Sequence, residues 1–359
     1  MPGVLRSTLA PRGPKRLPLL ALLSLTALLD GPAQAAECSS NPHFSPCLDA
    51  NTLWLPAGRA MFLSMPDTRV TGFGQVGFGG ASEVLHQPLL LRAPSPDSEG
   101  RDIHVLEYAV DVSYFVSFGL LRNLETSVLA SMRVDQSGAG VGGIVSQSAP
   151  PLEHNAVRDP RVGIAYSLDE ALAVPGLGLR LGLDATLPLG DRNPFSNERS
   201  FVVMPNAIFG FRHGALRLEA EFGARFRRAV DFGGVELGQQ GFVALGVAAS
   251  MLSDWLTLSA EVFGLPPLTS SRGSAASPRV SDIRLFPAEW LAGVHSAFGA
   301  RGPWTLSFAV GGGIPLSRET RESSAGSSQT SYFLGMTTPD FRSLLLVRFA
   351  PTEQSSAQR

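Results

Sequence analysis

The sequence is poor in charge, in cysteine and in long apolar segments. Its 359 residues carry 17% charged side chains and a formal net charge of −2, against about 25% charged residues in ordinary soluble domains. A nucleic-acid partner needs a basic patch, for which this charge balance gives no argument. After residue 36 no run of about 18 apolar residues occurs, so no transmembrane helix is expected there. If the chain lies in a membrane, it must cross it as a closed β-barrel.

The motifs of common catalytic and metal sites are also missing. The six histidines are dispersed and show no HExxH spacing, which a zinc protease would need. There is no GxSxG elbow of a serine hydrolase. We therefore predict no catalytic residue, no cofactor and no metal site. A barrel enzyme acting on lipid or peptide, with a Ser–His pair formed between loops, is kept as an alternative.

The first 36 residues have the pattern of a targeting segment. A basic start is followed by an apolar core at residues 17–29 and by the small-x-small sequence Ala33-Gln34-Ala35. The core is too short to span a bilayer comfortably, so residues 1–36 are interpreted as a removed signal peptide. At the other end, residues 351–359 are expected to be a disordered C-terminal tail.

The two cysteines, Cys38 and Cys47, come directly after the signal peptide. Export to an oxidising compartment predicts a local disulfide between them. A zinc site would need about four ligands, and only His43 lies nearby. Residues 37–66 alternate poorly and contain Pro42, Pro46, Pro56 and Pro66. We expect them to form an ordered but irregular periplasmic lead-in, with folding into the barrel mouth as one option.

Alternation is clearest between residues 200 and 228. From Leu216 to Phe226 the even positions are apolar, whereas the odd positions from 217 to 227 are charged or glycine. Successive side chains of a strand point to opposite faces, so this segment has one apolar and one charged face. Residues 201–212 also alternate, and His213-Gly214 supplies a tight turn. Both segments exceed the roughly nine to eleven tilted residues that cross a bilayer, which predicts a transmembrane β-hairpin.

The same reading along the chain predicts an all-β fold, a closed antiparallel transmembrane β-barrel with an up-and-down meander over residues 67–350. Twelve strands are expected, at about residues 69–78, 104–118, 124–134, 161–168, 177–189, 201–212, 216–228, 243–249, 256–262, 288–298, 306–310 and 341–349. The connections alternate between long and short, as in outer-membrane barrels with short periplasmic turns and long external loops. This pattern predicts that both termini are periplasmic. Trp255 and Trp304 each follow a short turn and are expected at the membrane interface.

Charged residues on the inward face of each strand are expected to line the lumen, because an arginine or lysine facing lipid at the midplane costs about 2–4 kcal/mol. Both signs are present, so no strong ion selectivity is expected. A twelve-stranded lumen lies between side-chain-filled cores and water-filled porins, so it could be narrow, or blocked by residues 37–66. The predicted lumen-facing residues are Glu107, Asp111, Arg133, Arg180, Asp184, Arg212, Arg217, Glu219, Glu221, Arg225, Arg227, Glu261, Arg342 and Arg348.

Four segments carry a family resemblance: residues 136–151 (QSGAGVGGIVSQSAPP), 158–165 (RDPRVGIA), 183–191 (LDATLPLGD) and 338–341 (TPDF). They resemble barrels found ahead of OmpA-type domains in myxobacterial outer-membrane proteins, over roughly residues 48–350. The resemblance implies a barrel fold. The wall-anchoring role does not carry over, because nothing after Phe349 matches a peptidoglycan-binding domain. Residues 344–349 also look like the terminal signal read by the barrel-assembly machinery, although ten residues follow.

These observations predict a Gram-negative outer-membrane protein that acts as a passive channel or transporter for small solutes. Its expected partners are outer-membrane lipid and the barrel-assembly machinery. Two alternatives stay open: a structural or assembly barrel whose lumen is closed by salt bridges, and the barrel enzyme. The sequence identifies neither a solute nor an oligomeric state.

Overall fold

The computed structural model describes residues 45–93, 101–140, 142, 152–172, 174–232, 235–251, 255–268, 286–298, 303–314, 334–335 and 338–351. The predicted signal peptide, Cys38, His43 and residues 352–359 of the predicted tail lie outside these residues.

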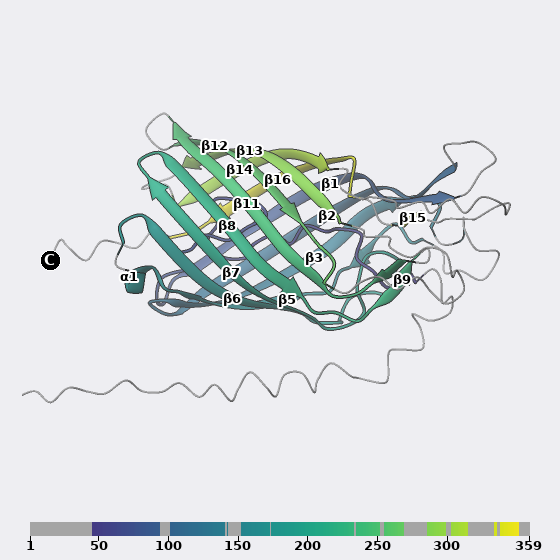
Figure 1. Ribbon diagram of the computed structural model, residues 1–359, viewed down its shortest axis with the longest axis horizontal. Helices are drawn as coiled ribbons and strands as arrows, with labels where there is room; N and C mark the ends of the chain where they lie inside the picture. Colours follow the sequence, from purple (N-terminus) through teal and green to yellow (C-terminus); the bar gives the residue numbers. More distant parts are fainter. Residues whose placement is uncertain are drawn as a thin grey trace, which may run out of the picture.

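Twelve long strands form a closed antiparallel barrel (Figure 1). Each strand pairs with its neighbours in the sequence, and β1 pairs with both β2 and β16, which closes the sheet. The predicted fold is therefore confirmed. The barrel strands are β1 (Val76–Ala93), β2 (Arg101–Leu121), β3 (Leu124–Ser137), β5 (Arg161–Ser167), β6 (Leu177–Thr186), β7 (Val202–His213), β8 (Leu216–Arg225), β11 (Gln240–Met251), β12 (Leu256–Gly264), β13 (Ala288–Phe298), β14 (Trp304–Gly313) and β16 (Phe341–Phe349).

Several short elements lie at the ends of the barrel. They are α1 (Asp169–Leu172), β4 (Ala156–Val157), the hairpin of β9 (Val230–Phe232) with β10 (Val235–Leu237), and β15 (Leu334–Gly335). We call the end that holds the β2–β3 and β7–β8 turns the short-turn end, and the opposite end the long-loop end. In the described part of the chain, no helix is both long and apolar enough to cross a membrane.

The first strand differs from the sequence prediction. It was expected at about residues 69–78 but runs over Val76–Ala93, so most of the segment predicted as a loop is strand. The inward positions 81, 83 and 85 are Ala, Glu and Leu, and the outward positions 82, 84 and 86 are Ser, Val and His. Each face of β1 mixes polar and apolar side chains. The sequence therefore lacks the alternation of polar and apolar residues that predicts a strand. Where the contrast is strong, the bounds agree: β13 and β16 begin and end at the predicted residues.

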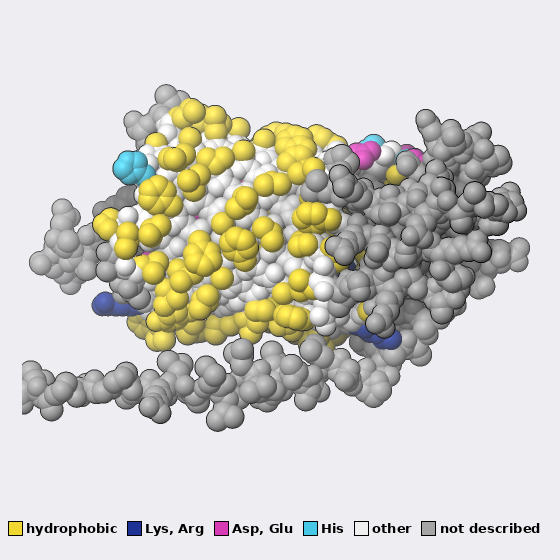
Figure 2. Space-filling model, viewed as in Figure 1, with side chains coloured by type: hydrophobic (Ala, Val, Ile, Leu, Met, Phe, Trp, Pro, Cys, Tyr) yellow, Lys and Arg dark blue, Asp and Glu magenta, His cyan; other side chains and the backbone are white. Residues whose placement is uncertain are grey.

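The outer surface of the barrel is apolar. Figure 2 shows hydrophobic side chains over the strands of the visible face, while the coloured charged groups lie near the two ends. Trp255 is 50% exposed next to a short turn, and Trp304 packs against Phe78 and Phe349 at the same end. Sequence reasoning missed exposed aromatics at the long-loop end, such as Trp290. This surface suits lipid contact, with aromatic residues near both rims.

Residues 45–72, which we call the lumenal segment, run through the interior of the barrel (Figure 1). At one end Leu48 packs in a cluster with Leu89 and Leu91 of β1 and Phe195, near the long-loop end. At the other, Asp67 contacts the side chains beside the β7–β8 turn. The segment therefore spans the lumen from the long-loop end to the short-turn end and then enters β1.

This path bears on two predictions. Residues 45–66 are irregular, as expected, and lie inside the barrel. The first described residues lie at the long-loop end, whereas β16 finishes at the short-turn end; the periplasmic placement of the two termini stays a prediction. An even number of strands fixes the end of the barrel at which β1 begins. It does not fix the path of the segment before β1, which is long enough to cross the lumen.

Candidate functional site

The backbone of the lumenal segment is held by charged side chains of the barrel wall. The segment has no helix and no strand beyond an isolated bridge at Asp49, so its buried N–H and C=O groups need other partners. The wall provides both acceptors and donors. Glu261 accepts from Leu63 N (2.9 Å) and Ser64 N (2.8 Å), Glu125 accepts from Thr71 N (2.7 Å), Arg225 donates to Thr52 O (3.0 Å), Arg348 to Pro56 O (3.1 Å), Arg180 to Asp67 O (3.2 Å) and Arg161 to Leu55 O.

Apolar side chains fix the segment to one side of the lumen. Leu53, Leu55, Phe62, Leu63 and Met65 are buried in one cluster with small and apolar inward residues, most of them from β1, β11–β14 and β16. The wall is shaped to receive them. A Cβ at position 246 of β11, where glycine stands, would come within 2.6–2.7 Å of Met65 and Phe62. Each fully buried side chain of this kind contributes about 1.5–3 kcal/mol, so this side of the lumen is a packed core.

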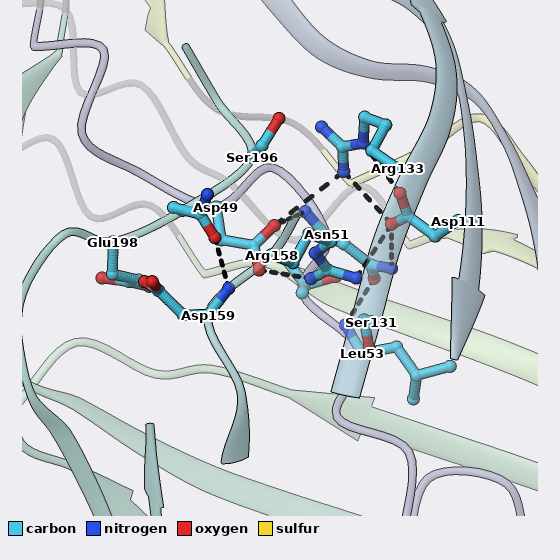
Figure 3. Close-up of polar contacts among 12 residues, drawn as sticks. Asp49, Asn51, Leu53, Asp111, Ser131, Arg133, Arg158, Asp159, Ser196 and Glu198 are labelled. Carbon is cyan, nitrogen blue, oxygen red and sulfur yellow. Dashed lines mark hydrogen bonds and ion pairs between the residues drawn. The ribbon is translucent and has the colours of Figure 1, made fainter. Parts of the chain in front are cut away.

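Near the long-loop end the segment joins a buried ion-pair cluster (Figure 3). The Asp111 carboxylate accepts from Arg133 (2.8 Å), Arg158 (3.0 Å) and the Asn51 amide (2.9 Å). Arg158 also pairs with Asp49. Asp111 and Arg133 are 1% and 0% exposed. The cluster thus joins β2 and β3 to the loop before β5 and to the lumenal segment.

Asp159, also in Figure 3, lies in the loop before β5. It accepts the backbone N–H groups of Gly190 (2.8 Å) and Arg199 (3.3 Å) in the β6–β7 loop. Burial raises the pKa of Asp159 to about 6, and the carboxylates of Asp49 and Glu198 add to the rise, while the two N–H groups oppose it. Burial in the folded protein therefore favours the protonated carboxyl, whereas the two N–H groups of the loop favour the carboxylate.

A second cluster is centred on Arg342 of β16. Its guanidinium pairs with Glu289 of β13 (2.8 Å) and with Glu83 of β1. It also donates to the side chains of Asn51 (3.0 Å) and Thr52 (3.4 Å). Arg342 and Glu289 are 0% exposed and Glu83 is 3% exposed. One buried cation therefore pairs with two carboxylates and also holds the lumenal segment.

The short-turn end is closed by a third set of polar contacts. Asp67 of the lumenal segment pairs with Arg212 and lies 3.8 Å from Arg217. Glu219 is 3.9 Å from Arg212, and neither of its carboxylate oxygens has a hydrogen-bond partner among the described residues. Thr68 donates to Asp169, at the start of α1 (3.2 Å).

Two small cavities remain between the lumenal segment and the polar wall. The outer cavity, of about 40 Å³, is lined by residues such as Asp49, Glu83, Asp159 and Glu198. The inner cavity, of about 30 Å³, is lined by residues such as Asp184, Asn206 and Glu221. Trp54, Leu55 and Arg161 line both. These volumes hold water but not a larger solute.

A Ser–His pair exists, but not in a form suited to nucleophilic catalysis. The His295 ring nitrogens lie 2.8 Å from the hydroxyls of Ser259 and Ser307. The imidazole therefore has a hydroxyl where a triad has a carboxylate, and it is only 2% exposed. Among the described residues, no three or more His, Cys, Asp or Glu side chains are grouped to hold a metal ion.

The structure buries most of the predicted lumen-facing charges inside the barrel. Those under a tenth exposed are Asp111, Arg133, Arg180, Glu219, Glu221, Arg225, Glu261, Arg342 and Arg348, and those partly buried are Asp184, Arg212, Arg217 and Arg227. Arg227 follows β8 and pairs with Glu198. Glu107 differs from the prediction because it is exposed. The β1–β2 register shifts beside it, between His86 and Leu89. The alternation of inward and outward residues along β2 therefore does not extend to Glu107.

Sequence reasoning missed the partners of these charges. The lumenal segment, which contains Asp49, Asn51 and Asp67, is irregular. Its sequence shows no periodic alternation of polar and apolar residues. Glu83 lies in the strand that was taken for a loop, and Arg161 begins β5, for which no inward face was assigned. Two acidic residues and an asparagine in a proline-rich lead-in were the only signal for the lumenal contacts. Cys47 is disulfide-bonded, while Cys38, its predicted partner, lies outside the described residues.

Comparisons with known proteins show the fold. No family model matches the sequence, and no curated protein matches it. A solved outer-membrane channel from Pseudomonas putida F1 matches with a TM-score of 0.54 at 12% identity, covering 80% of this chain and 99% of that chain. The chain has the fold of an outer-membrane β-barrel. The NanC porin (TM-score 0.42, 10% identity, 77% of this chain and 99% of that chain) and the KdgM porin (0.39, 7%, 76% and 99%) are more distant. The OmpA-type, myxobacterial part of the resemblance stays a prediction.

Proposed function

We propose that this protein is a passive channel for small solutes in the outer membrane of a Gram-negative bacterium, closed at rest by the lumenal segment. The observation that carries the proposal is that this segment fills the lumen without adding a strand to the barrel. The hydrogen-bonded pairing of the barrel strands is complete from β1 through β16 and back to β1. The segment can therefore shift without breaking any hydrogen bond between barrel strands. The fold shared with an outer-membrane channel is consistent with this function.

The orientation follows from the connections. Short turns face the periplasm in outer-membrane barrels, which puts the start of the lumenal segment at the cell-surface side. The apolar outer face contacts lipid, and β16 is the strand that the assembly machinery would read.

The structural barrel with a permanently closed lumen remains the second candidate. It is favoured by the Arg342 cluster, in which every charge is buried and paired. Under that alternative the lumenal segment never leaves its place, and the barrel does not conduct.

Planar-bilayer recordings separate the two candidates. We would compare the intact chain with a variant that lacks residues 45–66, after a heat-modifiable gel shift has shown that the variant is folded. The intact chain is expected to conduct rarely, and the variant in large, stable steps. A folded variant that does not conduct would overturn the channel proposal.

A point variant covers the case in which the deletion does not fold. Glu261→Ala removes the acceptor of two backbone N–H groups of the lumenal segment and should increase the frequency of openings. Phe222→Ala on the outer face, where Phe222 is 49% exposed, is the matched control and should leave conductance unchanged. If Glu261→Ala conducts no more than the control, the lumenal segment is not a removable closure.

A further inference from the structure

Within the described residues, two cavities in the lumen lie mostly against its polar side. The wall formed by β1, β11–β14 and β16 packs against the apolar side chains of the lumenal segment. The two cavities lie instead against inward residues such as Ser127 of β3, Arg161 of β5, Asp184 of β6 and Glu221 of β8. A solute that crosses this lumen would meet the least resistance along that polar side.

Both cavities are lined by one aromatic ring, Trp54, that contacts two cations. The Arg161 guanidinium lies 4.8 Å from the centre of the Trp54 ring, and the Arg225 guanidinium lies 4.4 Å from it. Each arginine also donates to a backbone carbonyl of the lumenal segment near Trp54. Arg161 donates to Leu55 O and Arg225 to Thr52 O. The cation–π contacts hold the ring in its place beside the outer and inner cavities.

Neither arginine makes a direct ion pair with a carboxylate among the described residues. Within the described chain, ion pairs of 4.0 Å or less are made by other lumenal arginines, such as Arg133, Arg180 and Arg342, but not by Arg161 or Arg225. The positive charge at the boundary of the cavities is therefore available to an anionic group.

The inner cavity also presents acceptor atoms without donors. Glu221 is 1% exposed and its Oε2 has no hydrogen-bond partner among the described residues, and Asn206, 9% exposed, leaves its Oδ1 without one. Among the described residues, Asp184 accepts the Asn206 amide (3.2 Å) and makes no ion pair of 4.0 Å or less. Arg180, which also lines this cavity, is already paired with Glu125 (2.8 Å). Buried acceptors without donors are costly, and a bound ammonium group would satisfy them.

We propose that the inner cavity is a binding subsite for a small zwitterionic solute, one that carries a carboxylate and an ammonium group. Arg161 binds the carboxylate, and Glu221 with Asn206 binds the ammonium group. Trp54 is the gate between this subsite and the outer cavity, because the inner cavity, at about 30 Å³, admits such a solute only when the ring moves. This inference rests on the proposed channel function and names its solute class.

Liposome swelling tests the proposal, with β-alanine as the zwitterion and erythritol as an uncharged reference. Trp54→Ala should increase the swelling rate for both solutes over the native protein. In the Trp54→Ala background, Arg161→Gln and Glu221→Gln should each lower the β-alanine rate relative to erythritol by about tenfold, the effect of losing one hydrogen bond to a charged group. Glu107→Gln is the control, since Glu107 is exposed and does not line the inner cavity. It should leave the ratio unchanged.

The outcomes are distinct from failure of the channel function. If the variant lacking residues 45–66 conducts but Trp54→Ala swells no faster than the native protein, the gate is wrong and the route lies elsewhere. If Trp54→Ala opens the route but Arg161→Gln and Glu221→Gln slow both solutes equally or neither, the zwitterion subsite is overturned. If the deletion variant is folded and does not conduct, the channel function itself fails.

Discussion

Replacement of Arg342 by Gln tests how the lumen is held together. The Arg342 guanidinium is the only ion-pair partner within 4.0 Å, among the described residues, of Glu83 and of Glu289. All three side chains are 3% exposed or less. The variant therefore leaves two buried carboxylates without a cation, and the side chains of Asn51 and Thr52 lose a contact to the wall.

Removing one partner of a buried ion pair costs about 3–5 kcal/mol, because the other charge is left uncompensated. We expect Arg342→Gln to lower the free energy of unfolding by that amount. The triple variant with Glu83→Gln and Glu289→Gln should lose less than Arg342→Gln alone, since no unpaired charge remains. This ordering separates the cost of an orphaned charge from the loss of contacts.

Urea unfolding in lipid vesicles, followed by the heat-modifiable gel shift, measures these differences. Arg69→Gln is the control, because Arg69 is 44% exposed and lies 3.8 Å from Asp67. An exposed pair of this kind is worth about 0–1 kcal/mol. The reasoning is refuted if Arg342→Gln costs no more than this control, or if the triple variant is the least stable of the three.

Three further results are expected. A cysteine in place of Phe222 should react with a membrane-confined reagent and one in place of Glu221 should not, because the first is 49% and the second 1% exposed; equal labelling would contradict the strand assignment. Unreduced mature protein should weigh two hydrogens less than its reduced form through a Cys38–Cys47 disulfide, and two free thiols would refute it. The Asp159 carboxyl, whose pKa is raised to about 6 by burial, should contribute its full stabilisation of the folded protein below about pH 4. That stabilisation is lost as pH rises through about 6, and is at most about 3 kcal/mol before solvent screening reduces it. Loop amide exchange that is flat across this range, or equal to that of Asp159→Asn, would count against it.

The barrel could be predicted from the sequence because its outer face is apolar and its inner face is polar. In β8, Phe222 faces outward and Glu221 inward. This alternation of apolar and charged side chains predicts the strands, the hairpins and the closed barrel. The reading failed in β1, where Glu83 has apolar neighbours on its own face, and at Glu107, where a register shift changes the parity.

The lumenal contacts could not be read in the same way. Parity places Arg342 and Asp111 on the inner face, but it does not say which group each will meet. Their partners include Asn51, which is 60 residues from Asp111 and 291 from Arg342 along the chain. Such contacts depend on the path of an irregular segment, and the sequence holds no periodic signal for that path.

The route of the lumenal segment also constrains how the barrel can assemble. The segment crosses the whole interior before β1 begins, and β1 pairs with β16, at the opposite end of the strand order. Because the segment precedes β1 in the chain, it can lie against the inner faces of the strands before the β1–β16 seam closes. Ala81 of β1 and Leu344 and Leu346 of β16 lie on the two sides of that seam and belong to the apolar cluster of the segment. Burial of the segment against both strands therefore favours the pairing of the first strand with the last.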